Sequence, residues 1–331
     1  MVEVAHTSFV ETEPYEVGFA THYEQHLKPL VEDFESRRQS AVKKFKKRLA
    51  LAVIWAPAIL ILSWWTLFEY LYVDPDWIEF YGYAVIFFIC AVVAYVYSSI
   101  EAYKGSIKGE IFPRIISFLG DYSFDAEPQI EMEKFANSQI LPSYDRVTNE
   151  DLTKGVYKNV SIEFFETELE KRVRTSKTYR YKTVFDGVVI CLSVKKSFEG
   201  QTIVLRDKGL IGNFLKQKFG TNLEKAGLED PKFEKIFEVF TDDQVEARYL
   251  LTTSFMERLL ELNDVFGGKG VQCSFNKETL LIMIPSSKDL FEAGSIFKRE
   301  DFVDDAKDLL KEMNLIFSVV DILKLDQDIG L

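Results

Sequence analysis

Residues 49–68, LALAVIWAPAILILSWWTLF, contain no charged side chain. The preceding stretch, RRQSAVKKFKKR, carries seven basic side chains and no acidic one. A helix of ~20 apolar residues is long enough to cross the ~30 Å hydrocarbon core of a bilayer. A surface helix of a soluble protein normally keeps a polar stripe along one side, and residues 49–68 have none. The pattern therefore predicts a membrane span.

A second uncharged run, FYGYAVIFFICAVVAYVYSSI, covers residues 80–100. The connection between the runs, residues 69–79, is too short for a domain, so we expect the two helices to form an antiparallel hairpin. This connection carries four acidic and no basic side chains, whereas basic residues flank both outer ends of the pair. Because Lys and Arg stay on the cytoplasmic side, both termini are predicted to be cytoplasmic.

The composition excludes several classes of function. The 331-residue chain has a formal net charge of −12, which argues against a general nucleic-acid binder because phosphates require an excess of Lys and Arg. Cys90, Cys191 and Cys273 are far apart and form no CxxC motif, so neither a disulfide framework nor a zinc site is indicated. All three histidines precede residue 27, which removes the usual general base from the rest of the chain. We therefore predict no catalytic residues, no cofactor and no metal.

The remaining chain predicts an α+β fold, in which the transmembrane hairpin precedes a cytoplasmic antiparallel-sheet domain with flanking helices. The expected parts are an N-terminal helical segment (1–48), the transmembrane hairpin (49–100), a juxtamembrane helix (101–119) and the α+β domain (120–331).

Residues rich in β-branched and aromatic side chains predict the strands of this domain. They are expected at 160–173, 179–194, 202–207 and 235–241, and as a hairpin over 271–285. The third strand is expected to follow a turn at Gly200, and the last hairpin to reverse at Asn276 and Lys277. Thr241 and Gln244 form a capping-box pattern that predicts the start of a helix. An amphipathic helix is expected over 299–325.

A basic stretch, KRVRTSKTYRYK, lies at the predicted reversal between the first two strands. An anionic leaflet attracts such a patch by about 1 kcal/mol per basic residue near the surface. The alternative is a solvated hairpin whose cations pair with Glu166, Glu168 and Glu170 on the neighbouring strand. The candidate membrane-surface residues are Lys171, Arg172, Arg174, Lys177, Arg180 and Lys182.

Three stretches, TVFDGVVICLSVKKSFEGQTIVL (183–205), FTDDQVEARYLLTTSFMERLLEL (240–262) and LLIMIPSSKDLFEAGSIF (280–297), resemble the bacterial family of domain of unknown function 3137. The N-terminal FATHYEQHLKPLVEDFESRR (19–38) followed by two spans also fits the layout of that family. The resemblance implies a protein of the bacterial inner membrane with a cytoplasmic domain. It implies no activity, because the family has no established one.

These observations favour a non-enzymatic binding or scaffold module anchored in the membrane. Its expected partners are the lipid bilayer and a protein, and the candidate binding surface is Phe185, Phe198, Arg248 and Tyr249. Two alternatives stay open at this point. One is a membrane-bound enzyme that uses carboxylates or a nucleotide, and the other is a subunit of an oligomeric channel or transporter. Self-association into a homo-oligomer is also left open.

Overall fold

The computed structural model forms two compact units. Unit 1 comprises Met1–Ile115 and Glu292–Lys307, and unit 2 comprises Ile116–Phe291 and Asp308–Leu331. The division expected from the sequence differs, because it kept residues 292–307 with the sheet domain. The residues described are 8–70, 75–175, 178–206, 223–228, 230–268, 270–286, 290–292, 294, 296–299 and 301–326.

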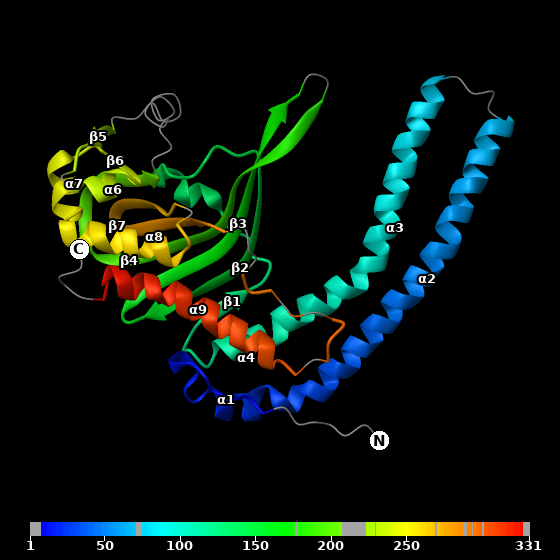
Figure 1. Ribbon diagram of the computed structural model, residues 1–331, viewed down its shortest axis with the longest axis horizontal. Helices are drawn as coiled ribbons and strands as arrows, with labels where there is room; N and C mark the ends of the chain where they lie inside the picture. Colours follow the sequence, from blue (N-terminus) through cyan, green and yellow to red (C-terminus); the bar gives the residue numbers. More distant parts are fainter. Residues whose placement is uncertain are drawn as a thin grey trace. The chain divides into compact units, whose positions relative to one another are not determined.

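Unit 1 is built on two long helices (Figure 1). Its elements are η1 (Pro14–Glu16), α1 (Phe19–His26), η2 (Lys28–Leu30), α2 (Val31–Tyr70), α3 (Pro75–Glu110) and the start of α4 (Phe112–Ile116). The predicted N-terminal helix is interrupted at η2, where Pro29 lacks a backbone donor, and α2 then runs unbroken through the first apolar stretch. The apolar side chains of Phe19, Tyr23, Leu27 and Phe34 in this segment are buried.

The apolar parts of α2 and α3 pack against each other along one narrow face. Half-buried residues recur on α2 at Ala52, Ala56 and Leu60, which is the three-to-four spacing of one helix face. Ser63 and Tyr81 join the two helices by a hydroxyl hydrogen bond of 2.8 Å. The remaining apolar surface is exposed. Of the 18 most apolar consecutive residues in the first helix none is buried within the protein, and of those in the second helix 17% are buried. Both helices are long and apolar enough to cross a membrane.

Unit 2 contains an antiparallel sheet of seven strands among the described residues. The order is β1-β2-β3-β4-β6-β5, and β7 also pairs with β4. The strands are β1 (Ser123–Asp125), β2 (Arg146–Tyr157), β3 (Val160–Arg174), β4 (Tyr179–Arg206), β5 (Glu224–Ala226), β6 (Phe237–Thr241) and β7 (Gln272–Pro285). The α+β class and the antiparallel sheet agree with the prediction.

Two predicted reversals are wrong. β4 continues through Gly200, and β7 continues through Asn276 and Lys277. The two strands pair along their length, with register shifts between Ser193 and Gln201 of β4. Lys277 has a φ of 52°, so the turn-like residues form an irregularity in a continuous ladder and the strand does not reverse.

The predicted capping box is also wrong. Asp243 caps α7 (Gln244–Leu250), because its carboxylate accepts hydrogen bonds from the backbone amides of Val245 and Glu246, each 2.9 Å long. Thr241 instead ends β6, and its hydroxyl lies 3.0 Å from that of Thr202 across the ladder.

Helical segments cover both faces of the sheet. They are η3 (Met132–Ser138), α6 (Pro231–Glu234), α7, α8 (Thr253–Val265) and α9 (Val303–Leu323), of which α9 belongs to unit 2 from residue 308. η3 packs Phe135 on Phe165 of β3, with ring centroids 5.6 Å apart. α8 packs Phe255 on Phe275 of β7, on the other face, at 5.8 Å. Unit 2 is therefore a sheet between two apolar layers.

Gly187 is required where β4 passes the end of β7. Its φ is +151°, and an added Cβ would lie 2.2 Å from the carbonyl oxygen of Ile284. We expect Gly187→Ala to destabilise unit 2 by about 2–4 kcal/mol, because both the backbone and its neighbour must move. A thermal melt of the purified full chain should show a melting temperature lower by several degrees. Gly227→Ala is the control, because its Cβ would meet nothing within 4 Å. Equal melting of both variants would contradict the assignment.

Candidate functional site

A two-stranded ribbon projects from the sheet of unit 2 (Figure 1). β2 ends its pairing with β3 at Glu170, and β7 ends its pairing with β4 at Gly187. Between these points β3 and β4 pair only with each other among the described residues. We call residues 171–182, at the end of this ribbon, the basic hairpin.

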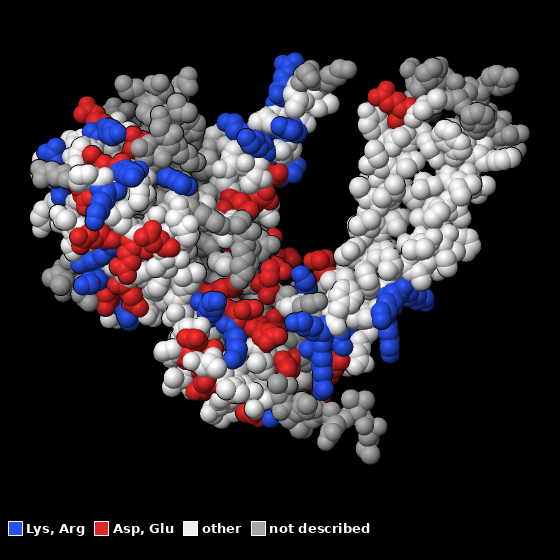
Figure 2. All heavy atoms as spheres, viewed as in Figure 1, with Lys and Arg blue, Asp and Glu red and all other residues white. Residues whose placement is uncertain are grey.

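The basic hairpin concentrates positive charge at an exposed tip (Figure 2). Its sequence contains no acidic residue, and Lys171 lies directly opposite Lys182 in the ladder. Like charges in that position destabilise a strand pair. Of the six predicted membrane-surface residues, Lys177 lies outside the described residues. The other five are exposed: Lys171, Arg172, Arg174, Arg180 and Lys182.

Two tyrosines on β4 hold neighbouring guanidinium groups in place. The guanidinium carbon of Arg172 lies 3.9 Å from the ring centroid of Tyr179, and that of Arg146 lies 4.0 Å from Tyr181. Both are cation–π contacts, which restrict the arginine side chains. Arg146 was missed in the sequence because it lies on β2, more than twenty residues before the basic stretch.

The alternative pairing with the glutamates of β3 is not what the structure shows. Glu168 accepts a hydrogen bond from the hydroxyl of Thr183 at 2.8 Å, and Glu170 forms an ion pair with Arg146 at 3.2 Å. Glu166 accepts a hydrogen bond from the backbone amide of Leu290. Within the described part of the chain, no residue of the basic hairpin forms an ion pair.

The second predicted surface is only partly a surface. Phe185 and Phe198 are 7% and 3% exposed, so both belong to the core and cannot contact a partner. Their alternating position in β4 directs them into the two apolar layers. Arg248 and Tyr249 are exposed on α7, where Tyr249 is 71% exposed. These two remain candidates for a contact.

The stretches that carry the family resemblance meet in a structural bracket. The carboxylate of Glu246 accepts hydrogen bonds from the backbone amides of Glu199 (3.1 Å) and Gly200 (2.8 Å). Asp242 accepts one from the amide of Gln201 at 2.7 Å. A Cβ on Gly200 would lie 2.7 Å from Asp242. This bracket of hydrogen bonds holds the start of α7 against β4. Glu246 and Asp242, which lie in the stretch that carries the resemblance, therefore have a structural role.

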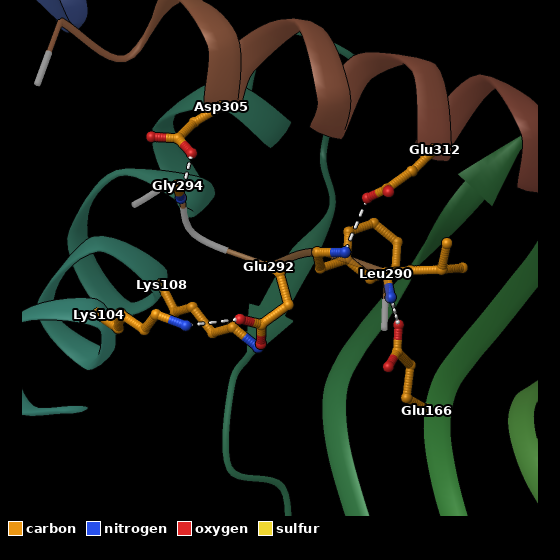
Figure 3. Close-up of polar contacts among 9 residues, drawn as sticks. Lys104, Lys108, Glu166, Leu290, Glu292, Gly294, Asp305 and Glu312 are labelled. Atoms are coloured by element: carbon orange, nitrogen blue, oxygen red, sulfur yellow. Dashed lines mark hydrogen bonds and ion pairs between the residues drawn. The ribbon is translucent and has the colours of Figure 1, made fainter. Parts of the chain in front are cut away.

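Other carboxylates are likewise occupied by backbone amides (Figure 3). In unit 2, Glu312 accepts a hydrogen bond from the amide of Phe291 at 2.7 Å. In unit 1, Asp305 accepts one from the amide of Gly294 at 2.6 Å. Burial raises the pKa of Glu292, but the hydrogen bond from Lys104 and the charge of Lys108 outweigh it and lower that pKa overall. No cluster of three metal-ligating side chains occurs among the residues described.

The thiols of unit 2 lie in apolar surroundings. Burial raises the pKa of Cys191 to about 11, with the nearby charge of Glu163 adding to the effect. Burial also raises the pKa of Cys273, which is 1% exposed. A nucleophilic cysteine needs a lowered pKa, so these positions fit buried structural thiols.

The geometry defines an α+β domain attached to a pair of apolar helices. Residues 183–325 match the model of the family described as "Protein of unknown function (DUF3137)". The N-terminal stretch that also fitted the family lies outside the matched residues. None of the curated proteins compared matches the chain. A solved structure, the mycobacterial trehalose monomycolate transport factor A (TtfA), is 12% identical with a TM-score of 0.35, covering 65% of this chain and 96% of that one.

Removing the carboxylate from the bracket tests its structural role. Glu246→Gln leaves one oxygen to accept the two amides, so we expect a loss of about 1–3 kcal/mol of stability. The measurement is the thermal melt of unit 2 in the full chain. Glu257→Gln on the exposed side of α8 should melt like the wild type. A melting temperature unchanged by Glu246→Gln would show that the bracket does not hold α7.

Alkylation of Cys191 tests the thiol environment. Because the pKa of Cys191 is raised to about 11, the thiolate forms only as the pH approaches that value. At pH 8 its alkylation should be slower than that of a free cysteine by about two orders of magnitude, and the rate should rise up to pH 11. Mass spectrometry after timed labelling gives the rate. A rate that levels off near pH 8 would contradict the raised pKa.

Proposed function

We propose that this protein is a two-pass, membrane-anchored binding module of the bacterial inner membrane without enzymatic activity. Residues 49–68 and 80–100 cross the bilayer, and both termini lie in the cytoplasm. The carrying observation is the exposed apolar surface of α2 and α3. Contiguous apolar surfaces of that extent are unstable in water and are stable in contact with lipid.

The charge at the ends of the helix pair supports this orientation. Figure 2 shows basic side chains at one end of the uncharged pair. At this end Arg48 donates hydrogen bonds to the hydroxyl of Ser98 (2.6 Å) and the carbonyl of Tyr95 (3.0 Å). Basic residues gathered at one end are retained on the cytoplasmic side.

The basic hairpin is the binding site that the geometry favours, and its ligand is an anionic lipid surface. Its own sequence contains no acidic residue, and tyrosine rings hold the guanidinium groups of Arg172 and of the neighbouring Arg146. Each basic residue near an anionic leaflet contributes about 1 kcal/mol. Because the module is tethered to a membrane, the effective concentration of that surface is high.

A protein partner is the second candidate, and its contact would be α7. Val245 is 80% exposed and Tyr249 lies one turn further along the same face at 71%. An apolar side chain and a tyrosine beside Arg248 have the composition of a small protein contact.

Cell fractionation tests the anchor. The chain should sediment with membranes and resist extraction by alkaline carbonate, because two apolar helices are held by lipid. Reporters fused to either terminus should be active only in the cytosol. Extraction into the supernatant, or an active reporter on the far side, would contradict the proposal.

Charge reversal tests the hairpin. The full chain in nanodiscs of zwitterionic lipid should co-float with vesicles containing anionic phospholipid. We expect Arg172→Glu, Arg174→Glu and Arg180→Glu together to reduce this binding at least tenfold, since six units of charge change at one tip. High salt should do the same.

The matched control reverses the same number of exposed charges elsewhere on unit 2, at Lys232, Lys235 and Lys311. It should retain most of the vesicle binding. Equal losses in both triple variants would show a general charge effect and would exclude the basic hairpin as a specific site.

A further inference from the structure

A short loop of unit 1, residues 296–299 (Ile-Phe-Lys-Arg), lies beside the cytoplasmic ends of the apolar helices. We infer that this loop enters the headgroup layer of the cytoplasmic leaflet and binds anionic phospholipid there, which adds a membrane contact to the two spans and the basic hairpin. The inference rests on the proposed spans. The loop itself lies almost 200 residues after the end of the second span in the sequence.

The loop is held against the long helices by named contacts. Arg38 of α2 donates a hydrogen bond of 2.7 Å to the carbonyl of Ile296, whose side chain is 3% exposed. The ring of Phe297 packs edge-on against Phe45 of α2, with centroids 5.8 Å apart. Phe45 in turn packs against Tyr97 of α3 at 5.7 Å. Phe297 therefore belongs to an aromatic cluster that spans both helices.

The depth of this cluster follows from helix geometry. Phe45 precedes Leu49, the first residue of the apolar run, by four residues, which is about 6 Å along the helix axis. The headgroup layer on each side of a bilayer is about 5–7 Å thick. Tyr97 already lies inside the second apolar run, residues 80–100. Phe297 therefore lies at the boundary between headgroups and hydrocarbon once the helices span.

The side chains of the loop suit that layer. Phe297 keeps 60% of its surface exposed although it packs against Phe45. Lys298 and Arg299 follow it and are exposed, and the loop contains no acidic residue. An aromatic ring next to basic side chains is the composition of interfacial anchors, in which the ring enters the acyl boundary and the cations bind lipid phosphates. The lysines at 43, 44, 46 and 47 add positive charge on the neighbouring helix.

A fluorescence experiment on the full chain tests the inference. Phe297→Cys is labelled with an environment-sensitive fluorophore in a Cys90→Ser background, and the protein is reconstituted in nanodiscs containing anionic phospholipid. Nitroxide-bearing lipids should quench the label several-fold more than they quench a label at Val17→Cys, and iodide in the water should quench it several-fold less. Val17 is the control position because it is 71% exposed and precedes α1. The next long helix, α2, begins at Val31, about 27 Å along its axis before the apolar run.

A second label site guards against a packing defect in the first variant. Lys298→Cys leaves Phe297 in place and should give the same preference for lipid nitroxides. Labels at both loop sites that behave like the one at Val17, in a chain that still resists carbonate extraction, would overturn the inference and leave the proposed spans intact. Extraction of the unlabelled chain by carbonate would overturn both.

Discussion

The constraint on which the rest of this protein depends is the exposed apolar surface of the helix pair α2 and α3. Inside α2 and α3 the backbone groups bond to each other, so the helices themselves are compatible with hydrocarbon. Their side chains pack together along one narrow face only, and the opposite faces carry branched and aromatic side chains with nothing from the described chain covering them. In the proposed arrangement lipid covers that surface, and the basic residues at one end of the helix pair keep that end on the cytoplasmic side.

The sequence was sufficient for features that depend on one continuous stretch. The two apolar runs, the helix preceding them and the strands at 160–173 and 179–194 follow from local composition and spacing. The sequence was insufficient where the pairing of a strand with its neighbour decides whether the chain continues or reverses. Gly200 and Asn276 have turn-forming residue types, yet β4 and β7 continue because each ladder supports the other across the irregular segment. Short edge strands such as β1 are stabilised by a neighbour and carry little signal of their own.

The candidate site shows the same division. The charge of the basic hairpin is visible in the sequence, because its basic residues are consecutive or nearly so. The contribution of Arg146 is not, since it arrives from a neighbouring strand. Phe185 and Phe198 occur in motifs that could equally signal a surface or a core, and only the sheet determines that both face inward. The loop at 296–299 is too short for any hydropathy window, so its place beside Phe45 required the fold.

The family match covers the sheet domain after the basic hairpin and leaves the hairpin itself out. The match begins at residue 183, directly after the basic hairpin, and it includes the bracket formed by Glu246 and the amides at 199 and 200. These hydrogen bonds order the backbone where α7 meets β4, so in this chain Glu246 has a structural role. In the basic hairpin, by contrast, Lys171 lies directly opposite Lys182, and like charges in that position destabilise a strand pair. Under the proposed function an anionic lipid surface neutralises these cations, and the proposed binding site then lies at the end of the ribbon, outside the matched residues.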